Sequence, residues 1–135
     1  MKLSKLSRIP FSVLFLSALA ACSGPFLLLP GSALVGPEAS IETAKISGES
    51  ALIELETRPA DPYSVNLNAF FIGGAAYIDP AEDRQWYQYL VEDANVRVKF
   101  AGDGTVYTAV AVRETDPGVV DQFEADRIVM RLDPR

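Results

Sequence analysis

The feature that most constrains the fold of this chain is a series of short runs in which apolar and polar residues alternate. Residues 96–100 alternate without exception, with two valines and a phenylalanine on one face and two basic residues on the other. A period of two residues is typical of a half-buried β-strand. Strands are therefore predicted at residues 51–57, 63–72, 75–78, 96–100, 105–113 and 127–132, and a further short strand at 43–47 is left open.

Turn and cap residues separate these strands. Gly73-Gly74 can take the positive φ angles of a two-residue hairpin, and a second turn is predicted at 102–104, which reads Gly-Asp-Gly. Asp116-Pro117 is typical of a helix start, and predicts a short helix that continues to residue 125. Because the connections are short, neighbouring strands are expected to pair antiparallel.

A longer helix is predicted between the third and fourth strands. Asp79 suits the N-cap, Pro80 the first helical position and Glu82 the third position of a capping box. The helix is expected to run from there to about residue 93, with Trp86, Leu90 and either Tyr89 or Val91 on its buried stripe. Six or seven strands with both faces partly apolar then favour closure into a small barrel, with the helices over its openings.

The first 21 residues have the layout of a secretory signal peptide. Three basic residues and no acidic residue precede an apolar run at 9–21, and small residues close that run. The 13 residues of the run would reach roughly 20 Å as a helix, short of the roughly 30 Å hydrocarbon core. Gly24-Pro25 then breaks any longer span, so cleavage is predicted rather than a membrane helix.

The tetrapeptide Leu19-Ala20-Ala21-Cys22 closes this segment and resembles the lipobox of bacterial lipoproteins. The resemblance implies a diacylglycerol on the Cys22 sulfur and cleavage before Cys22. Acylation also accounts for an exported protein with a single cysteine and no disulfide partner, and two or more acyl chains anchor a protein stably. The expected location is the cell membrane, lipid-anchored and facing the periplasm or the cell exterior. Ser23, rather than Asp, leaves the outer membrane open.

Residues 22–40 are predicted to be a spacer between the lipid and a domain at 41–135. Three prolines and three glycines in this range prevent a long regular element. Residues 26–29 are unusually apolar for a spacer. They could dip into the bilayer surface, pack on the domain, or dock on an envelope protein partner.

The charge of the chain after residue 21 argues against a polyanionic partner. Nine basic residues stand against eighteen acidic ones, a balance of −9. Such a body is repelled by nucleic-acid phosphates and by anionic headgroups. Nucleic acid is therefore excluded as a partner, and the membrane is expected as a partner through the lipid anchor.

The residue types also exclude several kinds of chemistry. The chain has no histidine, so no Ser-His-Asp or Cys-His arrangement is available, and its one cysteine is assigned to lipid. No metal site is predicted, because a zinc site lacks its ligands and the turn at 102–104 lacks spaced carboxylates. The carboxylate pairs Glu54/Glu56 and Glu82/Asp83 are interpreted as solvated surface or helix caps.

Four stretches of the predicted domain carry a further resemblance. They are residues 74–79 (GAAYID), 84–90 (RQWYQYL), 93–100 (DANVRVKF) and 102–113 (GDGTVYTAVAVR). They resemble the split β-barrel of FMN- or deazaflavin-binding oxidoreductases, the pyridoxamine-phosphate-oxidase-like group, and in particular its deazaflavin-dependent nitroreductase branch. The likeness covers roughly residues 50–132. The predicted fold class is therefore α+β: a small, mainly antiparallel split β-barrel of six or seven strands with two helices.

The resemblance implies a cofactor site and a cofactor, FMN or a deazaflavin. The residues it assigns to that site are Arg58, Tyr63, Ser64, Arg84 and Trp86. Asp61 departs from the basic run that helps to hold the cofactor phosphate in that branch. The aromatic residues nearby are interpreted as core, with a pocket for a flat ligand as the alternative: Tyr63, Tyr77, Trp86, Tyr87 and Tyr89.

The function expected from these observations is a non-catalytic binding or structural module that carries no cofactor. A flavin- or deazaflavin-dependent reductase is the alternative. A homodimer, as the resemblance implies, and an envelope protein partner both stay open.

Overall fold

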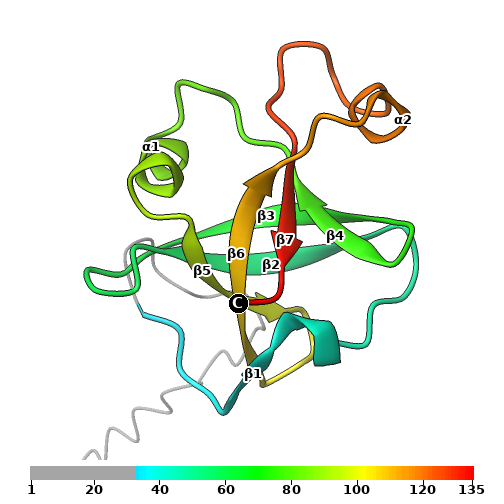
Figure 1. Ribbon diagram of the computed structural model, residues 1–135. Helices are drawn as coiled ribbons and strands as arrows, with labels where there is room; N and C mark the ends of the chain where they lie inside the picture. The colour runs from blue at the N-terminus through cyan, green and yellow to red at the C-terminus, as the bar shows by residue number, and fades with distance from the viewer. Residues whose placement is uncertain (1–32) are drawn as a thin grey trace, which may run out of the picture.

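The computed structural model describes residues 33–135, so the predicted signal peptide, Cys22 and most of the predicted spacer lie outside the described residues. In this part of the chain, seven strands and two α-helices follow one another, with one 3-10 turn (Figure 1). The strands are β1 (Glu38–Ser40), β2 (Ser50–Thr57), β3 (Tyr63–Ile72), β4 (Ala75–Ile78), β5 (Asn95–Phe100), β6 (Val106–Arg113) and β7 (Met130–Asp133). The helices are η1 (Ile41–Thr43), α1 (Gln85–Glu92) and α2 (Pro117–Val120).

Six of these strands close an antiparallel barrel in the order β6-β5-β2-β3-β4-β7, because β7 pairs with both β4 and β6. The remaining strand, β1, runs parallel to β6 beside residues 106–108. Residues 110–113 of β6 pair with β7. Since β5 occupies the other edge of β6, β1 and β7 share one edge of this strand. The predicted fold class is confirmed.

Strand pairing explains which side chains fill the barrel. β2 and β3 pair over the whole of β2, from Ser50↔Phe70 to Thr57↔Tyr63. Because side chains alternate along a strand, every second residue of β2 points into the barrel. The core residues that are fully or almost fully buried include Ile53, Leu55, Ala69, Ile78, Leu90, Val96, Val98 and Ala109.

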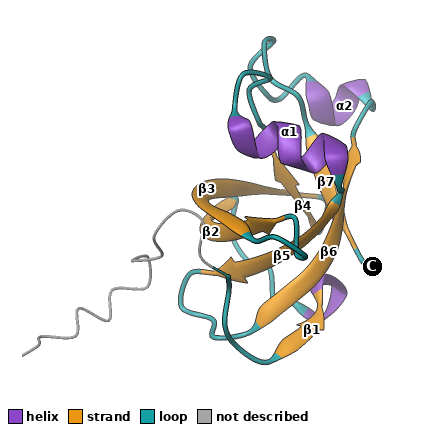
Figure 2. Ribbon diagram, turned by 90° about the vertical axis from the view of Figure 1, so that its left-hand side faces the viewer, coloured by secondary structure: helices purple, strands orange, loops and turns teal. Residues whose placement is uncertain are grey.

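Both α-helices lie at one end of the barrel, and β1 lies at the other (Figures 1 and 2). α1 packs over β2 and β3, with Leu90 buried and Trp86 and Tyr87 packed against the core. The predicted buried positions Trp86 and Leu90 are therefore confirmed, whereas Val91 is 65% exposed. Within residues 33–135, no helix is long and apolar enough to span a membrane.

The predicted hairpin and the second helix cap are confirmed. Gly73 and Gly74 join β3 to β4 with φ angles of 59° and 79°, a region that disfavours side chains. Asp116 caps α2, since its Oδ1 accepts the N–H of Gly118 at 3.0 Å. However, α2 ends at Val120 rather than at residue 125, and the last strand begins at Met130 rather than at residue 127.

The predicted start of the longer helix is wrong. α1 begins at Gln85, with Arg84 rather than Asp79 at the N-cap. Long-range contacts hold the preceding residues in an extended loop: the Pro80 carbonyl accepts the N–H of Ile128 at 3.1 Å, and the Asp79 carbonyl accepts a hydrogen bond from Arg127. Tertiary contacts therefore override the local capping pattern at Asp79, and the local sequence gives no sign of them.

The barrel takes up residues from the range predicted as spacer. Leu34 is buried, and residues 38–40 form β1. The open prediction of a strand at 43–47 is wrong, because η1 and an irregular segment occupy this position. Residues 38–40 show no alternation of apolar and polar residues, and they form a strand because they pair with β6.

Candidate functional site

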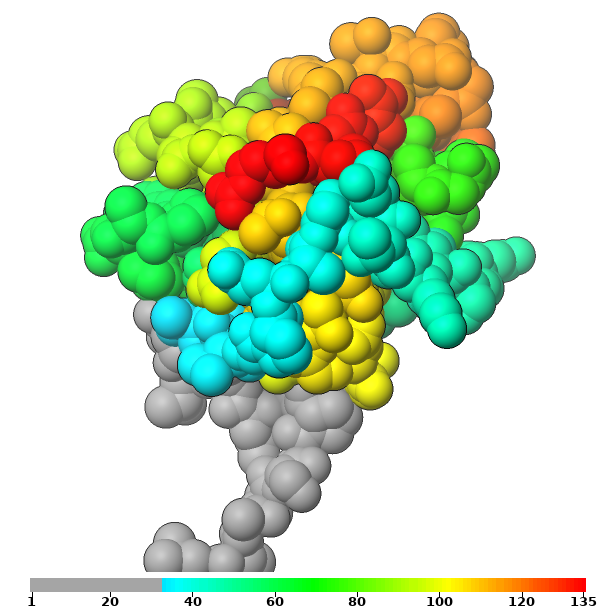
Figure 3. Space-filling view, turned by 60° about the horizontal axis from the view of Figure 1, so that its bottom comes forward, coloured from blue at the N-terminus to red at the C-terminus, as the bar shows by residue number. Residues whose placement is uncertain are grey.

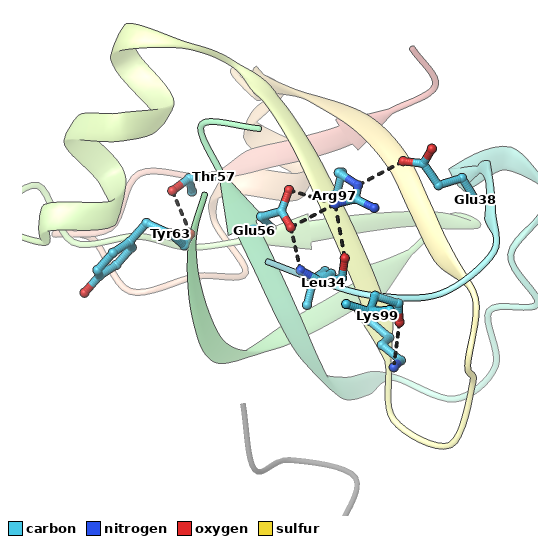
Figure 4. A network of polar contacts seen from close by, with 8 residues as sticks. Leu34, Glu38, Glu56, Thr57, Tyr63, Arg97 and Lys99 are labelled. Carbon is cyan, nitrogen blue, oxygen red and sulfur yellow. Dashed lines mark hydrogen bonds and ion pairs between the residues drawn. The ribbon is translucent and has the colours of Figure 1, made fainter. Parts of the chain in front are cut away.

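A buried ion pair joins β2 to β5 and holds the chain that precedes β1 (Figure 4). Arg97 Nη1 lies 3.0 Å from one carboxylate oxygen of Glu56, whose side chain is 0% exposed. The Leu34 N–H donates to the same carboxylate at 2.6 Å, and Arg97 donates to the Leu34 carbonyl at 3.2 Å. Arg97 Nε also contacts the exposed Glu38 at 2.9 Å. All of these groups bind one another, so the network fixes the chain and offers no free acid or base.

The interpretation of Glu54 and Glu56 as solvated surface is therefore wrong. Both side chains lie on the outer face of β2, opposite Lys99 and Arg97 of β5, and both are buried. Burial raises the pKa of Glu54, and the nearby Lys99 opposes this shift. The cover comes in part from the segment at Leu34, and Figure 3 shows the chain from residue 33 onward (cyan) lying against the residues around the β5–β6 turn (yellow). The other pair, Glu82 and Asp83, is exposed as predicted.

A hollow of about 470 Å³ opens between β3 and the start of α1. Its lining residues are Tyr63, Val65, Asn66, Leu67, Arg84, Gln85 and Trp86. Three of the five predicted site residues therefore meet here: Tyr63, Arg84 and Trp86. The hollow offers two aromatic rings and two aliphatic side chains for a flat apolar group, and the Arg84 guanidinium and the Gln85 amide for its polar edge.

Arg58 lies beside this hollow and is engaged elsewhere. Its guanidinium carbon is 3.5 Å from the centre of the Tyr89 ring, a cation–π contact. Tyr89 in turn meets the Tyr63 ring edge to face, with 5.3 Å between ring centres. Arg58 also pairs with Asp61 at 3.6 Å, and its backbone adopts a left-handed φ of 48°. The side chain is thereby held against the aromatic pair and does not line the hollow.

Ser64, the remaining predicted site residue, points away from the hollow. Side chains alternate along β3, so Ser64 lies on the outer face beside Glu56, while Tyr63 and Val65 face the hollow. Ser64 is 1% exposed. The structure therefore divides the predicted site into three residues that share a hollow and two that lie outside it.

This division decides how well the site suits a phosphate-bearing cofactor such as FMN or a deazaflavin. A phosphate needs several donors that converge on it. Of the three predicted donors, Arg58, Ser64 and Arg84, only Arg84 lines the hollow. Within one chain the residues present do not fit the phosphate, although the aromatic walls suit a flat ring.

Solved structures show what this barrel is similar to. A putative pyridoxamine 5′-phosphate oxidase from Listeria innocua superposes with a TM-score of 0.51 at 14% identity, over 63% of this chain and 84% of that one. This chain has the split-barrel fold. The protein Atu2129 of unknown function from Agrobacterium tumefaciens gives a TM-score of 0.52 at 18% identity over 64% of this chain, which spans 49% of that protein. An F420 reductase gives a TM-score of 0.45 at 16% identity, over 63% of this chain and 86% of that one.

The sequence itself has no such counterpart: no family model matches it, and no curated protein matches it. At these sequence identities the similarity shows the fold alone. The chemistry of the site has to be argued from the residues of this chain. Among residues 33–135, no three His, Cys, Asp or Glu side chains are grouped so that they could hold a metal ion.

Proposed function

We propose that this protein is a lipid-anchored envelope protein whose split barrel acts as a non-catalytic binding module. The observation that carries the second half of the proposal is the separation of Arg58 and Ser64 from the hollow at Trp86. It leaves an aromatic site with one guanidinium, which suits a flat ligand with a single acidic or polar edge. The Leu19–Cys22 tetrapeptide supports the first half.

The geometry of the chain is compatible with a short tether. Cys22 and Leu34 are 12 residues apart, which limits their separation to about 43 Å when fully extended. The Leu34 N–H donates to Glu56, and the Leu34 carbonyl accepts a hydrogen bond from Arg97. A lipid on Cys22 would therefore keep Leu34 within that distance of the bilayer surface.

Intact-mass measurement of the protein isolated from cells that carry its gene tests the anchor. The expected mass is that of a chain beginning at Cys22 with a diacylglyceryl group on its sulfur. A Cys22→Ser variant should lack this mass and leave the membrane fraction. An unmodified sulfur, or a chain that still begins at Met1, would refute the anchor.

A second candidate function is a flavin- or deazaflavin-dependent reductase, which the fold shared with the Listeria protein favours. Titration of the purified protein with FMN and with F420, followed by fluorescence, separates the two candidates. Absence of saturable binding is expected if the module is non-catalytic. Saturable binding that is lost in Arg84→Ala and Trp86→Leu, and retained in the exposed control Glu92→Gln, would establish the reductase alternative instead. Native mass spectrometry of the same sample reports whether a homodimer completes the site.

A further inference from the structure

A second hollow, of about 500 Å³, lies at the end of β3 that is distant from Tyr63. Its lining residues are Glu49, Phe70, Phe71, Ile72, Asp79, Gln122, Phe123 and Glu124. They come from four separate segments: the residue before β2, the end of β3, the loop after β4 and the loop after α2. The volume is in the range of small-molecule sites.

The interior of this hollow is aromatic. Phe70 and Phe123 meet edge to face, with 5.5 Å between ring centres and 86° between ring planes. This contact joins the loop after α2 to β3 and keeps Phe123 in place. Ile72 adds further apolar surface, while the ring of Phe71 packs against Phe100 and the barrel core. The hollow can therefore receive an aryl or alkyl group.

The remaining lining side chains include three carboxylates and no basic residue. Glu124 lies 3.7 Å from Arg127 Nε, an ion pair at the surface. Within the described part of the chain, Glu49 and Asp79 form no ion pair. Asp79 is partly buried; burial raises the pKa of its carboxyl, and the nearby Arg127 opposes this shift.

We propose that this hollow binds a small organic cation, an amine whose aryl or alkyl body packs on Phe70 and Phe123 and whose ammonium group pairs with Asp79 and Glu49. The negative balance of the chain attracts cations to it. An anionic ligand would meet three carboxylates, of which Glu49 and Glu124 are exposed and Asp79 is partly buried. The site shares no lining residue with the hollow at Trp86, so the proposal does not depend on the proposed function.

The test uses three probes that share one body: 2-phenylethylamine, 2-phenylethanol and 3-phenylpropionate. Binding to the full chain in neutral detergent is followed by ligand-observed NMR. We expect the amine to bind saturably, at least about tenfold more tightly than the alcohol, because a hydrogen bond to a charged group is typically worth that much. No saturable binding is expected for the carboxylate. Equal binding of all three probes, or no binding of the amine, would overturn the proposal.

Variants distinguish the site from a general charge effect. Asp79→Asn and Glu49→Gln should each weaken amine binding, and Phe123→Ala should weaken the amine and the alcohol alike. Glu92→Gln removes the same charge from the exposed face of α1 and should leave binding unchanged. If Glu92→Gln weakens binding as much as Asp79→Asn, the amine is attracted by net charge alone and the proposed site is wrong. Near-ultraviolet circular dichroism checks that each variant is folded.

Discussion

Glu56 and Arg97 face one another across β2 and β5, and together they bind both the N–H and the carbonyl of Leu34. Within residues 33–135, the pair binds the backbone close to the point where the described part of the chain begins. Removing Glu56 leaves the Leu34 N–H without its acceptor, and removing Arg97 leaves the buried Glu56 carboxylate without its counter-charge and the Leu34 carbonyl without its donor. Stability should therefore depend on this pair more than on any exposed ion pair of the barrel.

The first prediction is that Glu56→Ala lowers the free energy of unfolding by about 3–5 kcal/mol, the usual cost of breaking a buried ion pair. Urea denaturation followed by Trp86 fluorescence measures this. Glu38→Ala is the matched control, because its carboxylate also contacts Arg97 but is 56% exposed, and it should cost at most about 1 kcal/mol. Equal losses in the two variants would show that Glu56 is not the residue that holds Leu34.

Replacing Gly73 or Gly74 by Ala should each destabilise the protein by about 1 kcal/mol, because both have positive φ angles. An added Cβ meets no atom at either position, so the effect would come from backbone strain alone. Gly104 has the same open surroundings without a positive φ. Gly104→Ala should therefore be neutral or slightly stabilising in the same denaturation assay, and a loss as large as at Gly73 would contradict this explanation.

Asp116→Ala should lower stability by about 1 kcal/mol, the usual effect of removing an N-cap. Asp79→Ala should not show this loss, even though both residues precede a proline, because Asp79 caps no helix and its half-buried carboxyl has a raised pKa. Thermal unfolding of the two variants compares them directly. A larger loss in Asp79→Ala would mean that its side chain supports the fold.

The loss of folding stability at acidic pH should depend in part on Glu114. The N–H of Asp116, with that of Thr115 and the charge of Arg131, lowers the pKa of Glu114. The folded-state pKa of Glu114 lies below its unfolded-state pKa. The carboxylate therefore contributes its full stabilisation when the pH is above the unfolded-state pKa, and this contribution is lost as the pH falls through the folded-state pKa.

We therefore expect Glu114→Gln to lose less stability than the unmodified protein when the pH is lowered from about 6 to about 3. Denaturation midpoints across this range measure the difference. Glu92→Gln should follow the unmodified protein throughout. Parallel curves for Glu114→Gln and the unmodified protein would contradict the assignment.

The sequence predicted those elements whose causes are local. β3 and β4 occupy the predicted residues, because alternation and the Gly73-Gly74 turn fix strand and register together. α1 was placed too early because Pro80 is held by Ile128, 48 residues away. The local pattern at Asp79 contains no sign of this contact.

In the candidate site, too, some features follow from the local sequence and others depend on long-range contacts. Tyr63, Arg84 and Trp86 line one hollow, whereas Arg58 packs on the Tyr89 ring and Ser64 lies beside Glu56. Both of these placements depend on tertiary contacts. One signal for the buried network was present. Glutamates at 54 and 56 and bases at 97 and 99 share a spacing of two residues, which is typical of paired strands with charges on one face.

The edge of β6 that β1 and β7 share limits how far the N-terminus can be trimmed. A recombinant fragment cut at residue 41, the boundary suggested by composition, would lose β1 and leave the backbone groups at 106–108 without their strand partner. Such an open edge recruits other chains, so this fragment should self-associate, whereas a fragment starting at residue 33 keeps the edge covered. A fragment for crystallisation or binding experiments should therefore include residues 33–40, which the composition of the chain assigned to the spacer.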